Sequence, residues 1–110
     1  MGSSEVVTAR IKSTYARTKL AQGKLEEAKV IVGEAIASEV AILGVDDPEV
    51  LKDYELLAVI IERLGELENA GEVQTRALNG YCKHFGGLHY QTLAARQNLE
   101  RILAMCENRT

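Results

Sequence analysis

The sequence predicts an all-α domain of five helices, and three observations support this fold class. Apolar residues recur at steps of three and four along nearly the whole chain, which is the spacing of one helix face. Aromatic residues, which strands favour, make up only 5% of the 110 residues, and the chain has a single proline. Glycine stands at four breaks between the apolar series, and no stretch alternates as a strand does.

The first two helices are predicted on either side of Gly23. One apolar series at helical steps covers residues 7–18, and the next covers residues 25–43. The second series stops at Gly44, and a glycine just after the last periodic residue marks a helix end.

The third helix has a strong start signal. Asp47 can accept hydrogen bonds from the free backbone N–H groups of the first turn, and Pro48 suits the first helical position. The apolar series that follows runs to Leu64 and ends at Gly65.

Two further series predict the fourth and fifth helices. They cover residues 67–85, ending at Gly86, and residues 93–106. The short loops make neighbouring helices antiparallel. Three glycines fall inside helices, where each costs about 1 kcal/mol relative to alanine. They mark either close approaches of a neighbouring helix or soft positions: Gly33, Gly71 and Gly80.

An internal repeat of 42 residues organises the chain. The segment from Gly23 to Ala28 recurs from Gly65 to Ala70, and the same shift relates further small and apolar positions. Repeated helix pairs stack into a solenoid, so we expect one domain over 5–108 after a short polar leader at 1–4. Its units are repeat 1 over 5–44, repeat 2 over 47–86, and a terminal half-repeat or capping helix over 89–107.

The repeat resembles the tetratricopeptide repeat (TPR) over about residues 9–104. The resemblance is carried by the order of large, small and glycine positions in Tyr54-x-x-Leu57-Ala58-x-x-Ile61-x-x-x-Gly65-x-x-x-x-Ala70-x-x-x-x-x-x-Ala77. The links after Leu43 and Phe85 are similar to those of the 42-residue, kinesin-light-chain-like variant. This resemblance implies a right-handed superhelical stack of antiparallel hairpins, with each first helix on the inner wall. It also implies that His89 caps the fifth helix.

Two departures from the repeat pattern leave alternatives open. Lys12 and Lys19 occupy large positions of the first unit, and unpaired lysines are costly to bury. The first helix is therefore either a solvent-facing cap or shifted in register. Glu100 replaces the small crossing residue of the third unit, as expected either of a capping helix or of a piece of a longer array.

Charge and composition exclude several classes of protein. A net charge of −3 speaks against a nucleic-acid binder, and no apolar run reaches the roughly 18 residues of a membrane span. The start of the chain has no signal-peptide pattern, so we expect a cytoplasmic protein with reduced Cys82 and Cys106. The charge is uneven, since residues 1–24 carry +4 and residues 46–72 carry −7.

No motif for catalysis or cofactor binding is present, so we expect neither an enzyme nor a bound cofactor. Cys82, His84, His89 and Cys106 are the only conceivable zinc set, but their spacing is not that of a zinc finger. We therefore interpret them as core cysteines and loop histidines. The acid pairs near residues 26 and 46 lie at helix starts, where the positive end of the helix dipole stabilises acidic side chains. We therefore interpret them as capping residues rather than catalytic ones.

The resemblance also implies a concave groove on the first helix of each unit. Ten positions match the groove of the repeat: Arg10, Ser13, Arg17, Lys52, Glu55, Val59, Glu62, Gln97, Asn98 and Arg101. The four basic side chains suit a short acidic or carboxylate-bearing peptide, although the same residues could form ordinary solvated surface. Asn98 matches the asparagine that holds a bound peptide's backbone, whereas the two earlier units have Thr14 and Leu56 there.

The sequence thus predicts a non-enzymatic protein-interaction module of a larger adaptor or sensor. Its partner would be a protein or peptide, with no nucleic acid or membrane involved. The alternative is a structural module that self-associates into a homo-oligomer through exposed faces of its terminal hairpins.

Overall fold

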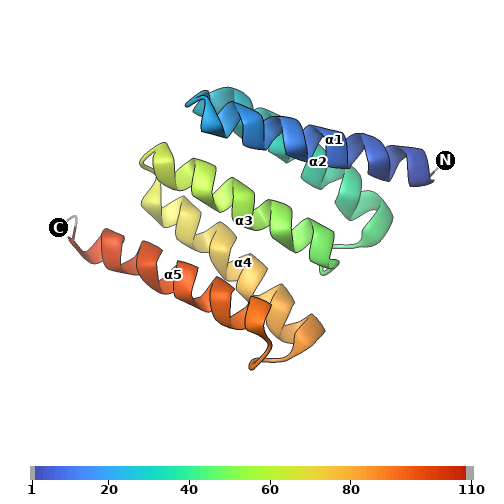
Figure 1. Ribbon diagram of the computed structural model, residues 1–110. Helices are drawn as coiled ribbons and strands as arrows, with labels where there is room; N and C mark the ends of the chain where they lie inside the picture. The colour runs from blue at the N-terminus through green and yellow to red at the C-terminus, as the bar shows by residue number, and fades with distance from the viewer. Residues whose placement is uncertain (1, 109–110) are drawn as a thin grey trace.

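The computed structural model describes residues 2–108, which form five α-helices (Figure 1). They are α1 (Gly2–Ala21), α2 (Leu25–Leu43), α3 (Pro48–Arg63), α4 (Leu67–Phe85) and α5 (Tyr90–Asn108). No strand occurs among these residues, which confirms the predicted all-α fold. Met1, part of the expected leader, lies outside the described residues, and α1 already begins at Gly2.

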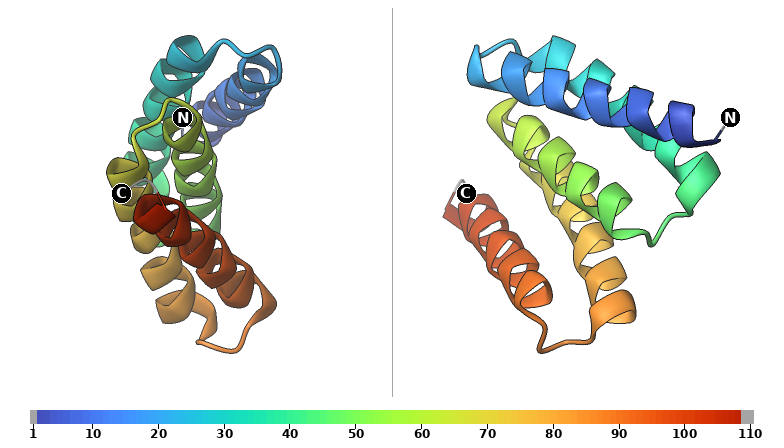
Figure 2. Two further views of the ribbon diagram at one scale, coloured as in Figure 1. Left: turned by 90° about the vertical axis from the view of Figure 1, so that its left-hand side faces the viewer. Right: turned by 45° about the vertical axis from the view of Figure 1, so that its right-hand side comes forward.

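The helices form a stack of antiparallel hairpins in two layers. α1 pairs with α2, α3 with α4, and α5 packs against α4. Seen from the side, α1, α3 and α5 lie in one layer, and α2 and α4 lie in the other (Figure 2). The stack measures 48 × 34 × 18 Å, so it is a slab two helices thick.

The 42-residue repeat of the sequence is also a repeat of the backbone. α2 and α4 both have 19 residues and are related by this shift. The residues before them have nearly the same dihedral angles, with φ −87° and ψ 73° at Lys24 and φ −91° and ψ 69° at Glu66. Gly44 and Gly86 follow them with φ 90°, a left-handed region that glycine enters without a steric penalty. Equivalent links therefore start the next hairpin in the same direction.

The starts of α3 and α5 are capped as predicted. Asp47 accepts a hydrogen bond from the backbone N–H of Glu49, at 2.9 Å from Oδ1. His89, which is 42 residues further on, accepts from the backbone N–H of Gln91, at 3.2 Å from Nδ1. Each side chain satisfies one backbone donor that the first helical turn leaves free.

Small residues let the hairpins close at the predicted crossings. Ala16 and Ala58 are equivalent in the repeat, and both are fully buried. Glu100, the third member of this series, is exposed on α5. The largest apolar cluster joins α1, α2 and α3: Ala16, Ala28, Val32, Ile36, Leu56 and Ile60.

The glycines within helices differ in how closely a neighbouring helix approaches them. A Cβ at Gly80 would overlap Cδ2 of the fully buried Leu51 and would lie 3.0 Å from its Cδ1, so α3 and α4 approach closely there. A Cβ at Gly33 would have no neighbour within 4 Å. In the repeat, Ala9 of α1 is equivalent to Leu51, and Ser38 of α2 is equivalent to Gly80. The larger residue of each pair therefore lies on the first helix in the second hairpin and on the second helix in the first hairpin.

The lysines at large positions of α1 form ion pairs with α2. Nζ of Lys12 lies 3.5 Å from Glu34, and Nζ of Lys19 lies 3.2 Å from Glu27. Lys19 also lies over the ring of Tyr15, 5.1 Å from its centroid. α1 thus has no unpaired lysine at these positions.

Candidate functional site

Two adjoining hollows lie on the layer formed by α1, α3 and α5. The first, which we call the α1–α3 hollow, has a volume of about 310 Å³ and is lined by Arg10, Ser13, Thr14, Arg17, Glu39, Glu49, Lys52 and Asp53. The second, the α3–α5 hollow, has about 260 Å³ and is lined by Arg17, Lys52, Glu55, Leu56, Ala58, Val59, Gln74, Asn98, Arg101 and Ile102. Arg17 and Lys52 line both, so the two hollows meet at this pair of cations.

The structure brings most of the sequence-predicted groove residues together. Eight of the ten line one of the two hollows: Arg10, Ser13, Arg17, Lys52, Glu55, Val59, Asn98 and Arg101. Glu62 lines neither hollow but contacts Arg101. Gln97 is exposed on α5 and lies outside both hollows. Side chains of α1, α3 and α5 thus make up most of the lining of the two hollows, together with Glu39 of α2 and Gln74 of α4.

Three of the four groove cations form no ion pair in the described part of the chain. Arg10, Arg17 and Lys52 are exposed and form no ion pair with any residue from 2 to 108. They come from α1 and α3, and all three line the α1–α3 hollow. Three acids line the same hollow, Glu39, Glu49 and Asp53, and the charge of Arg10 acts on Glu39. Cations that form no ion pair within the domain can pair with carboxylate or phosphate oxygens of a ligand.

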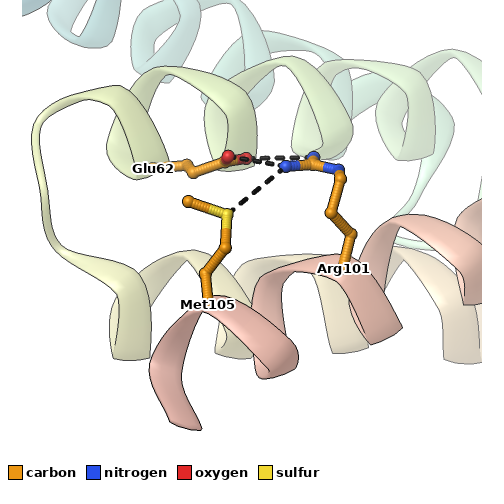
Figure 3. A network of polar contacts seen from close by, with 3 residues as sticks. All are labelled: Glu62, Arg101 and Met105. Atoms are coloured by element: carbon orange, nitrogen blue, oxygen red, sulfur yellow. Dashed lines mark hydrogen bonds and ion pairs between the residues drawn. The ribbon is translucent and has the colours of Figure 1, made fainter. Parts of the chain in front are cut away.

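Arg101 already has a partner (Figure 3). Its guanidinium donates to Glu62 of α3 through Nη1 and Nη2, at 2.6 Å and 3.0 Å, and Nη1 also contacts the sulfur of Met105 at 3.7 Å. The hydrogen bond to Glu62 raises the pKa of Arg101. Because this forked contact uses the face of the guanidinium that would bind an anion, Arg101 ties α5 to α3 in this structure.

Glu55 is the centre of a hydrogen-bond network that joins α3 to α4 and α5. The hydroxyl of Tyr81 donates to Oε1 at 3.1 Å, and the amide of Gln74 donates to Oε2 at 3.0 Å. The amide of Asn98 donates to Oε2 at 3.4 Å. Burial and the carboxylate of Glu55 raise the pKa of Tyr81, so its hydroxyl keeps the proton that it donates. The Asn98 amide, expected to contact a peptide, therefore also contacts Glu55.

Sequence reasoning missed a buried pair of acids beneath the α1–α3 hollow. Glu39 and Asp53 are 1% and 3% exposed, and Ser13 donates a hydrogen bond to Oδ2 of Asp53 at 2.6 Å. Burial raises the pKa of Glu39 to about 8, a hydrogen bond with Asp53 and its negative charge add to this rise, and Arg10 opposes it. Oε1 of Glu39 has no hydrogen-bond partner within residues 2–108. The repeat held the signal, because it aligns Glu39 with the buried Tyr81.

The cysteines and histidines form no metal site in the described residues. Cys82 and Cys106 are free and partly buried, so they border the core rather than lie within it. His89 lies in the loop before α5 as predicted, but the same prediction for His84 is wrong, because it belongs to the last turn of α4. Both rings pack against Phe85, at centroid distances of 4.6 and 4.2 Å. No three histidine, cysteine or acidic side chains within 2–108 could hold a metal ion.

The fold and these hollows define a class of protein, a helical-hairpin stack with a charged groove on the layer of its first helices. No protein-family model matches the sequence, and no curated protein matches it significantly. None of the helices in the described region is long and apolar enough to cross a membrane.

Proposed function

We propose that this chain is a non-enzymatic protein-interaction module that binds a short acidic peptide across the two hollows. The observation that carries the proposal is the group of three cations that form no ion pair within residues 2–108, Arg10, Arg17 and Lys52. A peptide with carboxylates would pair with these cations without first breaking an ion pair within the domain. Arg101 takes a secondary role in this proposal because Glu62 holds it.

Peptide titration of a charge-deleted variant tests the proposal. The double substitution Arg17→Ala and Lys52→Ala should lower the affinity for a labelled acidic peptide roughly tenfold or more at low salt, since exposed ion pairs contribute up to about 1 kcal/mol each. The control Lys24→Ala with Arg63→Ala removes the same charge from exposed positions that line neither hollow. If both double variants weaken binding equally, a local site is excluded and only net charge matters. The interaction should also weaken as salt screens the charges.

The proposal extends to the family and the cellular context. The alternation of first and second helices, the 42-residue step and the buried Ala16 and Ala58 support a TPR-like repeat of the kinesin-light-chain-like type. We propose that the module belongs to a larger adaptor or sensor. Two cysteines that form no disulfide agree with a reducing, cytoplasmic compartment.

Self-association is a second candidate function. It is supported by large apolar residues that are exposed at both ends of the stack, including Val7 and Ile11 on α1 and Leu93 and Leu103 on α5. Sedimentation over a concentration series distinguishes the two functions, because a peptide-binding monomer keeps its mass and a self-associating module does not.

A further inference from the structure

α1 lies at one edge of the stack (Figure 1). Its outer face carries a stripe of exposed apolar side chains. Val7, Ile11 and Tyr15 follow one another every four residues and are 53%, 63% and 52% exposed. They form the floor of a hollow of about 570 Å³, which we call the outer α1 groove, with Arg10 and Lys12 at its edges. α1 thus has two apolar faces, one buried against α2 and one open to solvent.

The repeat shows what covers this face elsewhere in the molecule. Residues 14 and 18 of the outer α1 groove are equivalent to Leu56 and Ile60 of α3, which are buried against Val32 and Ile36 of α2. The next equivalent of position 18 is Ile102 of α5, which is buried in a cluster with Ala70 of α4. At both inner positions a second helix of the preceding hairpin therefore lies on this face.

Charge decides which kind of helix fits the outer α1 groove. α1 carries four basic residues against one acid, and two of the four line the groove: Arg10, and Lys12, which is ion-paired with Glu34. The helix that covers the equivalent face of α3 has the opposite character, since α2 has four glutamates and one lysine. An acidic helix would bring carboxylates to the unpaired Arg10 at the edge of the groove, whereas a basic helix would be repelled.

We propose that the outer α1 groove docks an acidic amphipathic helix of a partner protein, laid along α1 as α2 lies along α3. A second copy of this chain is a poorer occupant. At the other end of its stack it exposes α5, which is equivalent to α1 and α3 rather than to α2. Two copies of α1 placed face to face would also oppose like charges. The outer α1 groove shares Arg10 and Thr14 with the α1–α3 hollow, so the two ligands would compete for Arg10, whereas Ile11 and Tyr15 line the outer α1 groove and neither of the two hollows.

Two peptides copied from the chain serve as matched probes. One has the sequence of residues 25–43, which is the acidic helix α2, and the other has that of residues 67–85, the α4 helix with equal numbers of acids and bases apart from histidine. In fluorescence anisotropy with the full chain, we expect the acidic peptide to bind at least roughly tenfold more tightly, and salt to reduce this difference.

Substitutions in the apolar stripe locate the contact. Ile11→Ala with Tyr15→Ala should weaken binding of the acidic peptide about tenfold or more, whereas Val30→Ala, an exposed apolar residue of α2, should leave it unchanged. None of these three residues lines the α1–α3 or the α3–α5 hollow, so failure here leaves the groove proposal standing. Circular dichroism of each variant verifies that the helices remain folded.

Five results would overturn the proposal. Neither peptide binds, or the neutral peptide binds as tightly as the acidic one. The acidic peptide binds equally well to the Ile11 and Tyr15 double variant, as it would if it replaced α2 within the hairpin. The chain dimerises through these two residues in sedimentation, which makes a second copy the occupant. Vesicles of anionic lipid bind through the stripe and the peptide does not, which makes a membrane surface the occupant.

Discussion

Replacing Gly80 with alanine should destabilise the domain, whereas the same change at Gly33 should stabilise it. Both glycines lie inside helices, α4 and α2, and neither has a positive φ. A methyl group at position 80 would overlap the side chain of Leu51, which is fully buried and cannot move into solvent. At position 33 the methyl group would point into open space.

The magnitudes follow from two opposing terms. Alanine is favoured over glycine inside a helix by about 1 kcal/mol at either position. Overpacking a filled core costs typically about 1–3 kcal/mol, and this cost applies only where Leu51 is in the way. We therefore expect Gly33→Ala to raise the free energy of unfolding by about 1 kcal/mol and Gly80→Ala to lower it by up to about 2 kcal/mol.

Urea unfolding followed by circular dichroism measures both changes. At an unchanged denaturant slope, the midpoint should rise for Gly33→Ala and fall for Gly80→Ala. The variant Leu51→Ala identifies the source of the cost. On its own it should destabilise by about 2–5 kcal/mol, but by less in the Gly80→Ala background, because the added methyl group fills part of the cavity. Equal stabilisation by both glycine substitutions, or strict additivity with Leu51→Ala, would refute the reasoning.

Three further predictions concern single side chains. Burial raises the pKa of Glu39 to about 8, so the folded protein keeps a proton that the unfolded chain loses from about pH 4.5 upward. The free energy of unfolding should therefore fall as pH rises between these values, and Glu39→Gln, but not the exposed Glu26→Gln, should flatten the dependence in urea melts at pH 5, 6.5 and 8. Asp47→Ala removes the cap of α3 and should cost about 1 kcal/mol in the same assay, and an unchanged midpoint would contradict it. Glu62→Gln should release Arg101 and increase the affinity for an acidic peptide, whereas a decrease would mean that Glu62 itself contacts the ligand.

The helices and their links could be predicted because their signals are local. Gly44 marks a helix end and Asp47 a helix start within a few residues, and the 42-residue shift then places the equivalent link at Gly86. The spacing of apolar residues marks the buried sides of α2, α3 and α4. It fails for α1, where Val7, Ile11 and Tyr15 are more than half exposed and the small residues Ala9 and Ala16 are buried instead. The helix ends and links thus depend only on short stretches of sequence and on the 42-residue repeat.

The parts of the site that were missed depend on contacts between helices. Arg101 has the same charge as Arg17, but only the packing of α5 on α3 brings Glu62 within 2.6 Å of it. Glu39 and Asp53 are single acids within the apolar series of α2 and α3, and the sequence does not show that they are buried together where these two helices meet α1. The sequence shows which residues are charged but not which residues they pair with. The cations without an ion pair could therefore be distinguished from the paired ones only in the structure.

The close fit of Leu51 into Gly80 limits how the two hairpins could be recombined. In the first hairpin the equivalent residues are Ala9 of α1 and Ser38 of α2, so the larger side chain belongs to the second helix instead of the first. A chimaera that joins α3 to a copy of α2 would set leucine against serine, and one that joins α1 to a copy of α4 would set alanine against glycine and leave a gap. Whatever copying event produced the two halves, they are no longer interchangeable parts, and an engineer who lengthens this array must transplant a hairpin as a whole.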